Sequence, residues 1–204
     1  PARFPQIANH YLESEPLLGP DKVLEFVAKA AEHAFSIQAY KYIVELSERG
    51  IEIAKESSHN LLGDLLALRA RAGNTMGPWP YSNQIRWDWQ AEAFEHFITT
   101  KEDAKAVGVA LLAGSIGGAR GTATVLKRAL DLVPDNDERH PWLALRYGIA
   151  LDNDLGDYDG AMAIYKAVRD QSIADGDRQL EARALAHFCQ TSVNMQKLEE
   201  GFDY

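Results

Sequence analysis

Apolar residues recur at steps of three and four along most of this chain, whereas the alternation typical of half-buried strands is scarce. In Asp21–Phe35, for example, Val23, Phe26, Val27 and Ala30 form one side of a wide apolar stripe. The same periodicity predicts further helices at Gln38–Glu56, Leu61–Ala72, Ile85–Ile98, Lys101–Ser115, Ala119–Val133, Arg139–Asn153, Tyr158–Ala174 and Arg178–Met195. The predicted fold class is therefore all-α.

Turn-forming residues separate these segments. Pro20 and Asp21 suit a helix start, because proline fits the first helical position and a carboxylate is favourable near the N-terminus. Pairs that tolerate positive φ at helix ends are Gly73-Asn74, Gly117-Gly118, Gly156-Asp157 and Gly176-Asp177. These signals predict about ten helices, with one long connector at Gly73–Asn83. No change of composition marks a domain boundary, so we expect a single domain over residues 1–204.

Internal self-similarity distinguishes a repeat protein from a helical bundle. When Leu155–Tyr165 is set beside Gln196–Tyr204, Tyr158 falls on Leu198, 40 residues further on, and the small Ala161 falls on a glycine. Gly156-Asp157-Tyr158, followed by Ala161 and Tyr165, resembles the turn, the small packing residue and the aromatic of the tetratricopeptide repeat. The resemblance implies a right-handed α-solenoid of about five antiparallel helix pairs.

The match departs from the tetratricopeptide pattern in places. Gly148 lies one position away from the expected small residue, and Ser47 and Gly50 replace the usual aromatic and alanine. The stretch Ala8–Tyr42 is more specific, because it resembles the first repeat after the ATPase module of LuxR-type transcription regulators and of cyclases with tetratricopeptide tails. Leu198–Tyr204 starts a second helix that ends after two turns, so we expect the chain to be a fragment of a longer one.

This resemblance implies a non-enzymatic interaction or sensor segment of a multidomain bacterial signalling or transcription regulator. The partner would be a protein or peptide, including other domains of the same parent chain. Two alternatives stay open: a free-standing adaptor that binds a peptide, and the non-catalytic tail of a nucleotide cyclase.

Charge and composition narrow the kinds of partner. The net charge is -9, and 21 basic residues are scattered among 30 acidic ones, which argues against a nucleic-acid partner. No apolar run reaches the roughly 18 residues of a membrane helix, so no membrane association is expected. The chain has a single cysteine, Cys189, which indicates a reducing compartment, the cytoplasm.

No sequence pattern predicts catalysis, a cofactor or a metal. The glycine-rich stretch Gly114–Thr122 lacks the lysine that a phosphate loop places before its final Ser or Thr, so it is interpreted as a turn. Cys189 lies near Leu185, Phe188 and Val193, which predicts a buried position rather than a reactive thiol. No two of the six histidines lie within five residues of each other: His10, His33, His59, His96, His140 and His187.

The long connector and the helix after it hold the candidate binding residues. Three of the four tryptophans lie within 11 residues, and prolines stiffen the backbone between them. Exposed Trp, Tyr and Arg are the usual anchors of protein interfaces. The candidate binding residues are Trp79, Tyr81, Arg86, Trp87 and Trp89. The alternative is that the connector folds back and packs its own rings against neighbouring helices.

Overall fold

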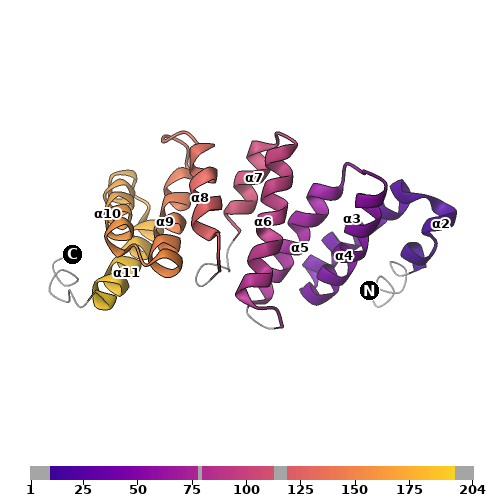
Figure 1. The fold of residues 1–204 in the computed structure, drawn as a ribbon, viewed down its shortest axis with the longest axis horizontal. Helices are drawn as coiled ribbons and strands as arrows, with labels where there is room; N and C mark the ends of the chain where they lie inside the picture. The colour runs from indigo at the N-terminus through magenta and orange to yellow at the C-terminus, as the bar shows by residue number, and fades with distance from the viewer. Residues whose placement is uncertain (1–9, 78–79, 113–118, 196–204) are drawn as a thin grey trace. The chain divides into compact units, whose positions relative to one another are not determined.

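A computed structural model of the chain describes residues 10–77, 80–112 and 119–195 (Figure 1). Within these ranges all regular secondary structure is helical and no strand occurs, so the predicted all-α class is confirmed. No helix in the described ranges combines the length and apolar character needed to cross a membrane. The copy of the repeat predicted at Gln196–Tyr204 and the glycine pair at 117 and 118 lie outside the described residues.

The chain divides into two compact units, residues 1–115 (unit 1) and residues 116–204 (unit 2). The boundary falls within the glycine-rich stretch Gly114–Thr122, which is interpreted as a turn from its sequence. The single domain over residues 1–204 therefore stays a prediction, and each unit is described by itself.

Unit 1 is a row of helices in which each one packs against the next along the chain (Figure 1). The helices are α2 (Glu15–Leu18), α3 (Pro20–Ser36), α4 (Tyr40–Glu56), α5 (Leu62–Met76), α6 (Asn83–Thr99) and α7 (Asp103–Ala110). Helix α3 also contacts α5, and α5 contacts α7. These three helices begin 42 and 41 residues apart. Helix α5 therefore lies between α3 and α7 within unit 1.

Unit 2 has the same kind of packing over fewer helices. Its elements are α8 (Thr122–Asp131), α9 (His140–Ala150), a π-helical turn η1 (Leu151–Leu155), α10 (Tyr158–Asp175) and α11 (Arg178–Asn194). Helix α9 contacts both α10 and α11. The turns predicted at Gly156 and Gly176 are confirmed, since both residues have positive φ, and Asp157 and Asp177 cap the helices that follow.

Small residues lie on both sides of the contact between α9 and α10. Ala161 of α10 is completely buried in a core cluster that also contains Tyr165 and Phe188. On the α9 side, a Cβ added at Gly148 would lie 2.8 Å from Cε1 of Tyr165. The two helices therefore approach closely at Gly148, and the Tyr165 ring fills the space that this glycine leaves.

Helix α5 does not end at Gly73-Asn74, as the sequence predicted, but continues to Met76. A Cβ at Gly73 would lie 2.7 Å from Cζ3 of Trp89, so this glycine serves helix packing rather than a turn. Helix α6 begins at Asn83, before the predicted Ile85, because the Ser82 hydroxyl accepts a hydrogen bond from the Ile85 amide. Helix α7 ends at Ala110, five residues before the predicted Ser115.

Replacing Gly73 by Ala is expected to destabilise the chain by about 1–3 kcal/mol, because the new methyl group would overlap the Trp89 ring. Gly108→Ala is the matched control. Gly108 is also helical, but a Cβ there meets no atom within 4 Å, so alanine should stabilise the helix by up to about 1 kcal/mol. Urea unfolding followed by circular dichroism measures both. Equal effects of the two substitutions would contradict the packing role of Gly73.

Candidate functional site

The predicted binding residues of the connector do not share one environment. Trp79 lies outside the described residues. Arg86 and Trp87 of α6 are each only 1% exposed, so neither presents its side chain at the surface of unit 1. The Arg86 guanidinium donates to the side-chain oxygen of Asn83, one turn earlier, and burial lowers the pKa of Arg86. For Arg86 and Trp87, these positions match the alternative in which the segment packs internally.

Tyr81 and Trp89 are half-buried and contact each other. Their rings meet edge to face with centroids 4.7 Å apart, and the Arg69 guanidinium lies 5.2 Å from the centre of the Trp89 ring. Both rings pack against a core cluster of α3, α4 and α5 that includes Ala31, Ile43 and Ala72. Burial, and then the carboxylates of Glu48 and Glu45, raise the pKa of Tyr81. A partner surface at Tyr81 and Trp89 stays a prediction.

The predicted burial of Cys189 is wrong. Cys189 is exposed on α11, and Val193, which was assigned to the same apolar face, is 53% exposed. Cys189 lies just beside the buried stripe of the helix, which consists of Leu180, Ala184, Phe188, Thr191 and Ser192. Hydroxyl residues complete this stripe, and the apolar periodicity of the sequence does not reveal them.

Two other sequence features can be located only in part. Residues 114 to 118 of the glycine-rich stretch lie outside the described residues, and Thr122 begins α8 with its hydroxyl donating to the Ala119 carbonyl. Among the described residues no three His, Cys, Asp or Glu side chains come close enough to hold a metal ion.

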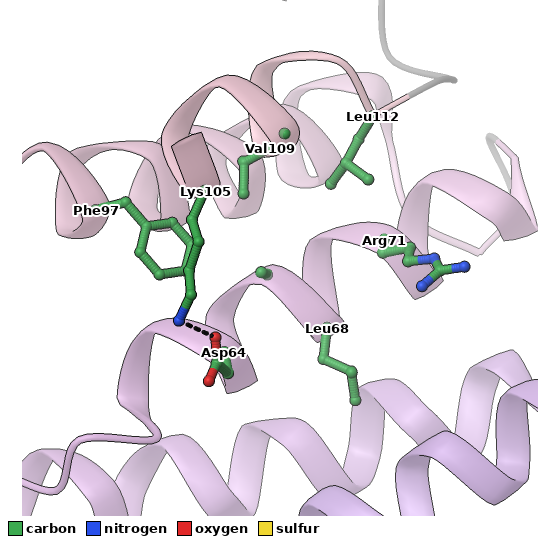
Figure 2. Close-up of a pocket in the computed structure, with 9 residues that line it drawn as sticks. Asp64, Leu68, Arg71, Phe97, Lys105, Val109 and Leu112 are labelled. Carbon is green, nitrogen blue, oxygen red and sulfur yellow. Dashed lines mark hydrogen bonds and ion pairs between the residues drawn. The ribbon is translucent and has the colours of Figure 1, made fainter. Parts of the chain in front are cut away.

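A groove of about 360 Å³ lies between α5 and α7, a site that the sequence did not predict (Figure 2). Each α5 residue that lines it has a counterpart 41 positions later that also lines it. The four pairs are Asp64 and Lys105, Ala67 and Gly108, Leu68 and Val109, and Arg71 and Leu112. Phe97 of α6 completes the lining. We call this set of residues the α5/α7 groove.

One end of the α5/α7 groove is closed by ion pairs. The Lys105 ammonium lies 2.8 Å from an Asp64 oxygen, drawn in Figure 2, and 2.9 Å from a Glu102 oxygen. It also lies 5.3 Å from the centre of the Phe97 ring. The hydrogen bond with Asp64, followed by that with Glu102, raises the pKa of Lys105, so the ammonium stays charged. The positive charge of Lys105 is therefore fully paired within the chain, and the three groups together carry one net negative charge.

The other end carries Arg71, which has a different environment. Its side chain is exposed, and its guanidinium lies 4.7 Å from the centre of the Phe35 ring of α3. Among the described residues, Arg71 forms no ion pair with a carboxylate. Between Arg71 and Lys105 the lining is apolar, with Leu68, Val109 and Leu112 (Figure 2).

Buried hydrogen bonds behind the groove fix the positions of α5, α6 and α7. The Asn74 amide of α5 donates to the Gln90 side-chain oxygen of α6 at 2.9 Å, and the Gln90 amide donates to the Val109 carbonyl of α7 at 2.7 Å. Gln90 is fully buried, so breaking this chain of hydrogen bonds would leave unsatisfied polar groups. The network holds Val109 in place and pre-organises the groove.

In unit 2, polar and aromatic side chains add to the apolar core cluster that joins α9 and α11. The Thr191 hydroxyl donates to the Asp152 carboxylate at 2.5 Å, and the Arg183 guanidinium lies 5.5 Å from the centre of the Trp142 ring. Burial, and then the charge of Arg183, lowers the pKa of Arg146 to about 10. These contacts link α9 and its π-helical turn to α11. The hydrogen bond of Thr191 and the ring contact of Arg183 favour this packing. Burial of Arg146 near the like charge of Arg183 opposes it.

Comparison with known proteins adds no family assignment. No protein-family model matches the chain, and no curated protein matches it significantly.

Proposed function

We propose that this chain is a non-enzymatic protein-interaction scaffold of tetratricopeptide-like helix pairs, arranged as a right-handed α-solenoid. We further propose that it serves a multidomain bacterial signalling or transcription regulator in the cytoplasm. The proposal of a parent regulator rests on the resemblance of Ala8–Tyr42 to the first repeat of such proteins. The interaction role rests on the α5/α7 groove.

The groove carries this proposal because it combines three properties of a binding site. It is concave and of about 360 Å³, near the lower end of the range for ligand pockets, which suits one or two side chains of a partner. Its centre is apolar and its two ends carry charged groups. The buried network through Gln90 holds its walls in place, which lowers the entropic cost of binding.

Filling the groove with a side chain of the protein itself is expected to abolish partner binding. Gly108 lines the groove, is exposed, and has no atom within 4 Å of an added Cβ. Gly108→Phe should place a ring in the groove without a clash at Cβ, and phenylalanine is a better helix former than glycine. Random dodecapeptides displayed on phage, selected on the wild-type chain, provide the probes, and fluorescence anisotropy measures their affinities.

Two outcomes decide the proposal. We expect Gly108→Phe to lose at least tenfold in affinity (about 1.4 kcal/mol or more), while Gly108→Ala binds like the wild type and neither variant melts at a lower temperature. If no peptide is enriched, or if the selected peptides bind Gly108→Phe as tightly as the wild type, the groove is not the binding site.

A further inference from the structure

The two ends of the α5/α7 groove differ in how their positive charges are satisfied. Lys105 has two carboxylate partners, Asp64 and Glu102, at hydrogen-bonding distance. Arg71 has no carboxylate partner among the described residues. Three apolar residues of the groove separate it from the ion pairs of Lys105. A carboxylate brought by a partner can therefore pair with Arg71 without displacing an existing ion pair.

Arg71 is also positioned for such a contact. Its guanidinium lies over the Phe35 ring at 4.7 Å from the ring centre, which restricts the side chain beside the groove. A guanidinium can donate two parallel hydrogen bonds to one carboxylate. The adjoining Leu68 and Leu112 offer apolar surface to the neighbouring part of the partner (Figure 2).

We infer that the partner of the α5/α7 groove is a peptide segment in which a large apolar side chain fills the groove and an adjacent Asp or Glu side chain pairs with Arg71. This inference rests on the proposed function and specifies the partner's chemistry. The net charge of -9 of the chain further limits the charge that the partner segment can carry. A strongly acidic segment would be repelled by the rest of the surface, so the partner carries one acidic residue in an otherwise neutral or basic segment.

A charge reversal at Arg71 tests the inference in the full chain. Phage selection with the wild type should enrich peptides with one Asp or Glu beside a large apolar residue. The display fuses the C-terminus of each peptide to the coat protein, so the displayed peptides have no free C-terminal carboxylate. Selection on Arg71→Glu should enrich Lys or Arg at the same place. The matched control is Lys22→Glu, which makes the same charge change at an exposed position of α3 that does not line the groove.

Affinities of one selected peptide complete the test. Arg71→Gln should weaken its binding about tenfold, as expected for loss of a charge-assisted hydrogen bond, and changing the peptide's acidic residue to its amide should weaken wild-type binding equally. The two changes together should cost little more than either alone. Circular dichroism melts of both Arg71 variants check that they fold.

The possible failures of the inference and of the proposed function are distinct. If Gly108→Phe blocks binding but Arg71→Glu leaves the charge preference unchanged, the groove binds a partner and the inference about Arg71 is wrong. If Lys22→Glu changes the preference as much as Arg71→Glu, the effect comes from net charge, and the inference is also wrong. If synthetic peptides bind only with a free C-terminal carboxylate, the acidic side chain is not the recognised group.

Discussion

Replacing Trp87 by Ala is expected to lower the free energy of unfolding by about 3–5 kcal/mol. Trp87 is 1% exposed on α6, which packs between α5 and α7. Truncation removes a large apolar surface from the core and leaves a cavity that neighbouring helices can fill only partly. Urea unfolding followed by the far-ultraviolet circular dichroism signal measures the loss.

Ile85→Ala is the matched control for Trp87→Ala, because Ile85 lies on the same helix and is 43% exposed. Its loss should stay below about 1 kcal/mol. If Trp87→Ala costs no more than Ile85→Ala, Trp87 is not a core residue. The tryptophan would then again be available as part of a partner surface.

In unit 2, replacing Tyr165 by Ala is expected to cost about 3–5 kcal/mol. The Tyr165 side chain is fully buried in the core cluster of α9, α10 and α11. Its ring lies against Gly148 and stacks on the His187 ring with centroids 5.8 Å apart. Because Gly148 has no side chain to occupy the space beside the ring, truncation leaves a cavity there. Denaturant unfolding of the variant measures the loss.

The hydroxyl of Tyr165 should matter much less than its ring. The hydroxyl is buried and makes no hydrogen bond of good geometry within the described part of the chain. Burial, followed by the Asp152 carboxylate, raises its pKa, and the nearby Thr191 hydroxyl only partly offsets this. Tyr165→Phe keeps the ring and removes a buried polar group, so stability should change by less than about 1 kcal/mol, with a gain as the favoured direction. A loss in Tyr165→Phe as large as that in Tyr165→Ala would contradict this assignment.

Local signals in the sequence were sufficient to predict the all-α class and several turns. The turns at Gly156 and Gly176 depend only on a residue that tolerates positive φ and on the Asp that follows and caps the next helix. The turn predicted at Gly73 is wrong because the role of this glycine depends on Trp89, which is 16 positions later in the chain. A glycine in a close helix contact and a glycine in a turn look alike in a single sequence.

The candidate site could not be predicted for a related reason. Eight of the nine residues that line the α5/α7 groove are related by a spacing of 41. Two of these four pairs are of like type, but Asp64 with Lys105 and Arg71 with Leu112 are not. A search for self-similarity finds like residues and misses pairs that are complementary. The clustering of aromatic residues near the connector predicts a binding surface. However, Trp87 and Arg86 are buried because α6 packs against α5 and α7, and this packing is not visible in the sequence.

The contact pattern within each unit also determines how the chain folds. In unit 1 the main contacts join helices that are neighbours or next neighbours along the sequence, and unit 2 follows the same rule. Only short loops must close before such contacts form, so the entropic barrier is small. We expect rapid folding that starts at any stable helix pair and extends to its neighbours. By the same rule, a destabilised terminal helix can unfold while the helices further inside the unit stay folded.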